Sequence, residues 1–100
     1  MLIVAGVIEI DPANREKAVG VATRMMEETR REPGCVSYVF SADLASPGTF
    51  RLFEEWRSQA DLDAHFATPH MATFQAAMGG LGVKRVDIHK YQIAAKGPVR

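Results

Sequence analysis

The sequence has one cysteine, no net charge and no long hydrophobic run. Cys35 alone cannot form an intrachain disulfide, which is typical of a reducing compartment. Lys plus Arg and Asp plus Glu both number 12, so the chain lacks the basic surplus of a nucleic-acid binder. The apolar start, residues 1–10, is too short to span a bilayer and lacks the features of a signal peptide. We therefore expect a cytoplasmic protein with no nucleic-acid or membrane partner.

Segments with strand and helix patterns alternate along the whole chain. Strands are expected over residues 2–10, 35–43, 49–57 and 83–93. Helices are expected from Pro12 to about Arg31, from just after Ser58, and from Pro69 to Gly79, with Asp11, Ser58 and Thr68 as their N-caps. The βαββαβ order predicts an α+β, ferredoxin-like fold with one antiparallel sheet and the helices on one face. We expect one domain over residues 1–94 and a short tail over residues 95–100.

The first strand is apolar on both faces, which has a consequence for assembly. One face carries Leu2, Val4, Ile8 and Ile10, and the other carries Ile3, Ala5 and Val7. A strand of this kind is usually covered on both sides, whereas the helices can cover only one side of this sheet. A second copy of the same sheet would cover the other side. The sequence therefore predicts a homodimer formed through sheet faces.

Glu54 is the candidate proton-transfer group of the third strand. It lies on one face between Leu52 and Trp56, where loss of hydration should raise the pKa of its carboxyl group. A carboxyl group with a raised pKa can take or give a proton near neutral pH. The alternative is a structural ion pair across strands with Arg51, Lys84 or Arg85.

The segment His65-Phe66-Ala67-Thr68-Pro69-His70-Met71 carries two of the three histidines. His65 is expected on the inward side of its helix, with Leu62 and Phe66, where it can act as acid or base. His70 is expected to cap the next helix or to face the mouth of a pocket. The spacing of the two histidines does not place both on one helical face. Asp61 and His65 do have i, i+4 spacing, but no third ligand is evident for them, so we expect no metal site.

Large apolar side chains are abundant for so small a domain. Val36, Tyr38 and Phe40 are expected on one face of the second strand. The bulky set consists of Tyr38, Phe40, Phe53, Trp56, Phe66, Met71, Phe74 and Met78. We expect these side chains to form the hydrophobic core in the first place, and they could also line a narrow pocket for a flat aromatic ligand.

Together these motifs resemble the antibiotic biosynthesis monooxygenase domain family, and within it the small quinol monooxygenase-like proteins. The matching residues are Glu32-Pro33-Gly34-Cys35-x-x-Tyr38, Phe50-x-x-x-Glu54-x-Trp56-x-Ser58, Leu62-x-x-His65 and Thr68-Pro69-His70-Met71-x-x-Phe74. The resemblance implies a dimeric α+β barrel with a cavity between sheet and helices in each subunit. It also implies oxidation of a quinol-like or polycyclic hydroxylated aromatic by O2, without metal, flavin or other cofactor.

The resemblance also assigns roles to individual residues. Glu54 and His65 would be catalytic. The substrate-binding residues would be Tyr38, Trp56, Phe66, His70, Met71 and Phe74. Two alternatives stay open: an isomerase of a small hydroxyketone or phosphorylated sugar-like molecule, and a non-catalytic dimeric module that binds small molecules.

Overall fold

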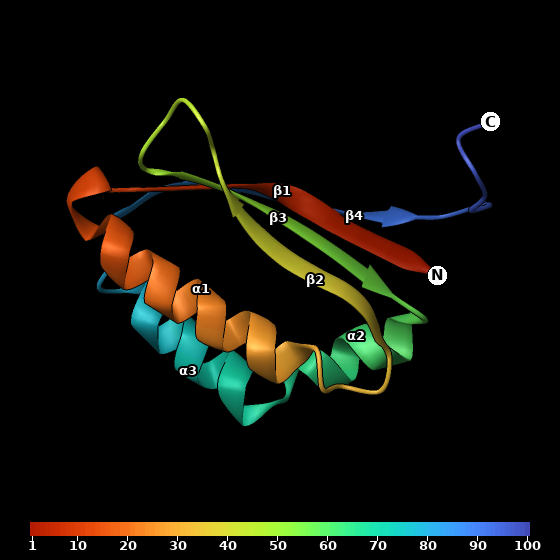
Figure 1. Cartoon of the computed structure of the whole chain (residues 1–100). Coiled ribbons are helices and arrows are strands. Elements are labelled where there is room, and N and C mark those ends of the chain that lie inside the picture. Colours follow the sequence, from red (N-terminus) through yellow and green to blue (C-terminus); the bar gives the residue numbers. More distant parts are fainter.

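Four antiparallel strands form one sheet in the computed structural model, which describes residues 1–100 (Figure 1). The strands are β1 (Leu2–Ile10), β2 (Cys35–Ala42), β3 (Thr49–Trp56) and β4 (Val83–Gln92). Their order across the sheet is β2-β3-β1-β4, and each neighbouring pair is antiparallel. With the helices in the connections, this is the ferredoxin-like α+β fold that the sequence patterns predict.

The three expected N-caps are present, although the first precedes a short 3₁₀ helix and not the first α-helix itself. The α-helices are α1 (Arg15–Thr29), α2 (Gln59–Phe66) and α3 (Pro69–Met78). Asp11 caps a 3₁₀ turn that leads into α1, and Ser58 and Thr68 accept backbone N–H groups at the starts of α2 and α3. No helix has the length and apolar character needed to cross a bilayer.

All three helices lie on one face of the sheet, and the core is packed between the two layers (Figure 1). Alternate residues of each strand point into this core, because side chains along a strand alternate between faces. One cluster contains Leu2, Met25, Tyr38, Leu52, Trp56 and Leu62. A second contains Ile8, Ile10, Ala18, Phe50 and Leu81. The fold thus places Tyr38 and Trp56 under the helices.

The start of β2 differs from the expected alternation. Cys35 pairs with Trp56 and Ser37 with Glu55, so Val36 is an extra residue in a bulge. Cys35 packs against the core, whereas Val36 is 42% exposed. The expectation that Val36 shares a face with Tyr38 and Phe40 is therefore wrong, because the bulge shifts the register by one residue.

The face of the sheet opposite the helices carries apolar side chains that no helix covers. Ala5 of β1 pairs with Phe53 of β3, which pairs in turn with Val39 of β2. Phe53 is 43% exposed. The bare apolar face predicted from the first strand is therefore present, and we refer to it as the outer face of the sheet.

Two glycines differ in what surrounds them. A Cβ atom at Gly6 would overlap the backbone carbonyl oxygen of Asp87, so the close approach of β1 and β4 requires glycine there. A Cβ atom at Gly20, in the middle of α1, would meet nothing within 4 Å. Glycine inside a helix is less stable than alanine by about 1 kcal/mol, so the packing of the chain does not account for Gly20.

Candidate functional site

Glu54 lies in the core and is only 5% exposed. The Nε1–H group of Trp56 donates a hydrogen bond of 2.7 Å to Glu54 Oε1. Burial raises the pKa of Glu54 from its ordinary 4.5 to about 7; the Trp56 hydrogen bond opposes the rise, and the negative charge of Glu32 adds to it. Glu54 can therefore exchange a proton near neutral pH.

None of the basic residues considered as partners for Glu54 reaches it. Arg51 forms an ion pair with Asp43, and Arg85 pairs with Glu9 and Asp87. Lys84 makes no ion pair with any carboxylate. The cross-strand ion pair left open by the sequence is absent, and the polar partner of Glu54 is an indole.

The inward face of α2 brings His65 beside Trp56, the hydrogen-bond partner of Glu54. His65 is 1% exposed, and its ring centroid lies 4.8 Å from that of Trp56 and 5.7 Å from that of Tyr38. Tyr38 itself pairs with Glu54 across β2 and β3. Burial and the charge of Glu54 raise the pKa of Tyr38, so this phenol remains protonated. The four side chains form one buried group from three elements.

Glu32, in the turn that connects α1 to β2, joins the two histidines. Its Oε2 atom accepts hydrogen bonds from His65 Nδ1 at 2.7 Å and from His70 Nε2 at 2.8 Å. A carboxylate only accepts, so both nitrogen atoms carry hydrogen. In neutral His65 the lone pair is then on Nε2, which has no hydrogen-bond partner within the chain, and this atom can accept a proton.

The join between α2 and α3 is fixed by Thr68. Its hydroxyl group donates to the carbonyl oxygen of His65 at 2.7 Å and accepts from the backbone N–H of Met71 at 3.3 Å. One side chain thus closes the end of α2 and caps α3. This is why histidines on two different helices can reach the same oxygen atom of Glu32.

Glu32, His65 and His70 each offer one atom that could bind a metal ion, and these three atoms lie within 4.8 Å of one another. Two histidines with a carboxylate are a set that could hold a metal ion. The structure thus brings together a set of possible ligands that the spacing of the sequence does not predict. Two ligands on a tetrahedral zinc ion lie about 3.4 Å apart. The nitrogen–oxygen distances of 2.7 and 2.8 Å are instead those of hydrogen bonds, so this arrangement favours protons over a metal ion.

The remaining residues of the predicted site lie in different surroundings. Met71 and Phe74 pack against the core cluster that contains Tyr38 and Trp56. Phe66 touches His65, with ring centroids 5.7 Å apart, but is 56% exposed. The expectation that Phe66 shares the inward side of α2 with Leu62 and His65 is therefore wrong, because Phe66 follows His65 directly and leaves that face.

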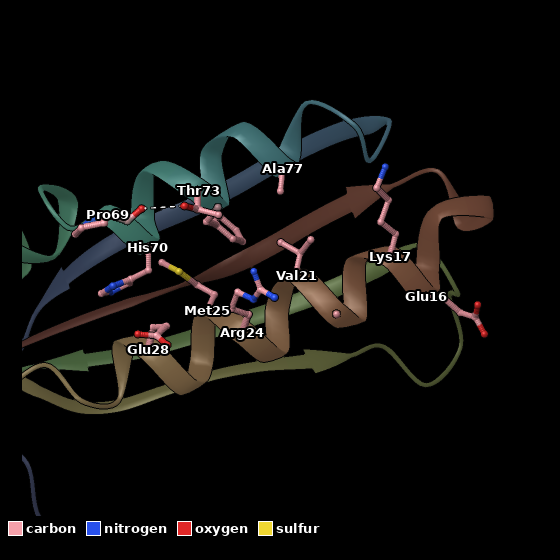
Figure 2. Close-up of a pocket in the computed structure, with 12 residues that line it drawn as sticks. Glu16, Lys17, Val21, Arg24, Met25, Glu28, Pro69, His70, Thr73 and Ala77 are labelled. Carbon is pink, nitrogen blue, oxygen red and sulfur yellow. Dashed lines mark hydrogen bonds between the residues drawn. The ribbon is translucent and has the colours of Figure 1, made fainter.

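A hollow lies between α1 and α3, and we call it the α1–α3 groove (Figure 2). Its volume is about 900 Å³, and its walls include Met25, His70 and Phe74. A second hollow, between the sheet and the helices, measures about 20 Å³ and is lined by apolar side chains only. The larger space thus lies elsewhere than in the cavity expected between sheet and helices, because core side chains fill that layer.

The raised pKa of Glu54 leads to a prediction about stability. The folded state holds this proton more tightly than the unfolded state, so the contribution is full below pH 4.5 and is lost as pH rises through about 7. Glutamine does not titrate and keeps an oxygen atom for Trp56. Relative to wild type, Glu54→Gln should therefore gain free energy of unfolding from pH 4.5 to about 7 and then level off. Urea denaturation at each pH measures this; a difference that is constant across the range would contradict the raised pKa.

Known proteins share sequence similarity with most of this chain. The sequence model of a family described as antibiotic biosynthesis monooxygenase matches residues 1–77. The uncharacterized protein sll1783 of Synechocystis sp. is 38% identical over 93 residues, which are 93% of this chain and 63% of that protein. The chain thus spans less than two thirds of that relative. The probable quinol monooxygenase YgiN of Escherichia coli is 29% identical over 90 residues, covering 80% of this chain and 86% of that protein.

The fold agrees with these sequence matches. The solved structure of Rv0793 from Mycobacterium tuberculosis superposes with a TM-score of 0.87 at 28% identity, over 97% of this chain and 98% of that one. The family match covers most of the chain, including the whole segment from Glu32 to Phe74 that builds the buried group. The chain belongs to the antibiotic biosynthesis monooxygenase family.

Proposed function

We propose that the protein is a cofactor-independent monooxygenase that oxidises a quinol-like or polycyclic hydroxylated aromatic with O2. The observation that carries the proposal is the buried pair of proton acceptors, Glu54 and His65, placed against Trp56 and Tyr38. Family membership and the quinol monooxygenase name of the Escherichia coli relative support this class of substrate.

In the proposed reaction, a base removes the proton of an aromatic hydroxyl group. The resulting anion is electron-rich enough to pass electrons to O2 itself. One oxygen atom is then bonded to the ring, and the other leaves as water with two hydrogen atoms from the substrate. A phenol with a free para position becomes a quinone in this way, and no outside reductant is needed. The protein has to hold the substrate, exclude water and accept the proton.

Two groups can accept that proton. Glu54, with a pKa of about 7, is partly ionised at neutral pH, and its Oε1 is held by Trp56. His65 can accept at Nε2, and the imidazolium ion that forms would be stabilised by Glu32 at its Nδ1 side. We assign the first deprotonation to Glu54, and we assign acceptance of the second substrate proton to the free Nε2 atom of His65.

Oxygen consumption tests this proposal. Metal-stripped protein is assayed with 1-naphthol, anthrone and 1,4-naphthohydroquinone, and the rate without protein is subtracted for each. We expect uptake with at least one of them, and we expect Glu54→Gln to reduce it by about 100-fold or more, which is the usual contribution of a general base.

Glu27→Gln is the matched control, because Glu27 is an exposed carboxylate on α1 away from the site. It should retain the wild-type rate. An undiminished rate in Glu54→Gln would contradict its role as the base. Turnover of a hydroxyketone without oxygen would support the isomerase alternative instead.

We also propose that a second copy of the chain covers the outer face of the sheet. Phe53, Val39 and Ala5 lie in one row across this face, and a second sheet would remove them from water. Such a dimer leaves the helices of both copies on the outside. It would form the α+β barrel implied by the family resemblance.

Substitution on the outer face tests the dimer. Phe53→Lys places a charge in the centre of the face, so the mass measured by light scattering should fall from twice the chain mass of 11.0 kDa to a single chain. Val19→Lys is the matched control, because Val19 is 45% exposed on α1 and Phe53 is 43% exposed. A wild-type protein that is monomeric at micromolar concentration would contradict the proposal.

A further inference from the structure

We propose that the α1–α3 groove is a binding site for a flat aromatic carboxylate. The apolar body of this ligand would lie against Val21 and Phe74, and its carboxylate would pair with Arg24. The groove includes His70 and Phe74 from the predicted substrate-binding residues, but none of Glu54, Tyr38, Trp56 and His65 lines it. The inference goes beyond the proposed oxidation, since binding here requires no turnover.

The groove has the size of a small-molecule site. Its volume is about 900 Å³, and sites for ligands of this class span roughly 300–1,000 Å³. It lies in the helical layer, on the opposite side of the molecule from the outer face of the sheet (Figure 1). A partner that covers the outer face would therefore leave the groove open.

Gly20 makes room in the wall that α1 contributes. Lys17, Gly20 and Arg24 fall on one stripe of the helix, with the two cations two turns or about 10 Å apart. A side chain at the position between them would extend into the groove, and a Cβ atom there meets nothing within 4 Å. Alanine would fit and would favour the helix, so packing does not require the glycine, and the groove is open at this point.

The charges that face the groove without a partner are positive. Arg24 and Lys17 form no ion pair within the chain. Of the two acidic residues in the wall, Glu28 pairs with Arg31, and Figure 2 shows the Glu16 carboxylate pointing away from the groove. Lys17 lies near Gly80, at the end of α3. Arg24 is therefore the cation without an ion-pair partner in the middle of the groove.

An arginine in this position selects for a carboxylate. Its planar guanidinium can donate two parallel hydrogen bonds to the two carboxylate oxygens. The apolar part of the wall comes from Val21, Met25, Phe74 and Ala77. A flat ring that carries one carboxylate matches both parts of this surface.

Calorimetric titration with 2-naphthoate, and with the uncharged 2-naphthamide, tests the proposal. We expect wild type to bind naphthoate more tightly than the amide, and Arg24→Gln to lose about tenfold or more for naphthoate but not for the amide. Arg57→Gln, which removes an exposed arginine outside the groove, should bind naphthoate as wild type does. Equal affinity of Arg24→Gln and wild type for naphthoate, or no binding by wild type at millimolar ligand, would overturn the proposal.

Gly20 supplies a second test. Gly20→Leu should weaken binding of both ligands by about tenfold or more, because its side chain would occupy the part of the groove beside Arg24. Gly20→Ala should raise Tm by about 4 °C, which shows that a side chain is tolerated at this point of the helix. Undiminished binding by Gly20→Leu would show that the ligand lies elsewhere.

The titration also separates this site from the buried group. Glu54→Gln should bind naphthoate as wild type does, because Glu54 does not line the groove. Loss of binding in Glu54→Gln would place the naphthoate in the buried site and would overturn the proposal. Heat of binding does not depend on oxygen uptake, so either proposal can fail while the other stands.

Discussion

The site depends on one oxygen atom, Glu32 Oε2, which accepts N–H groups from His65 and His70. These two bonds tie the turn after α1 to both later helices, so the position of α2 against the sheet and the orientation of the His65 ring have a common cause. The same negative charge contributes to the raised pKa of Glu54. Loss of Glu32 would therefore affect the proton on His65, the proton on Glu54 and the geometry of the α2–α3 join together.

The candidate site and the hydrophobic core use the same residues. Tyr38 and Trp56 belong to a core cluster and also enclose Glu54 and His65. Burying ionisable groups is unfavourable unless they are hydrogen-bonded, and here Trp56 Nε1 and Glu32 supply the bonds. The low polarity that makes Glu54 a base near neutral pH is thus a property of the core itself. This explains how a domain of 100 residues can build such a site without a large cavity of its own.

Local signals in the sequence predict most of the fold, and they fail where contacts are distant. The caps at Ser58 and Thr68 and the alternation that buries Glu54 act over a few residues, and both predictions are confirmed. Glu32 was missed as a partner because it lies 33 and 38 residues from the two histidines, and no periodic pattern reports such a contact. The bulge at Val36 could not be predicted from the sequence, because one inserted residue leaves the apolar pattern intact. The α1–α3 groove depends on how two helices that are distant in sequence pack together, so it could not be predicted from local patterns. The glycine at position 20 of α1 is the one local feature that is consistent with it.

The central claim is that Glu32 holds His65 with hydrogen on Nδ1 and a free lone pair on Nε2. Long-range ¹H–¹⁵N correlation spectra of the histidine rings measure this directly, recorded at about pH 8, above the ordinary pKa of imidazole near 6.5. The account predicts that neutral His65 carries its proton on Nδ1 and that neutral His70 carries its proton on Nε2. A neutral His65 with its proton on Nε2 would contradict the account, since that nitrogen could then accept nothing from a substrate.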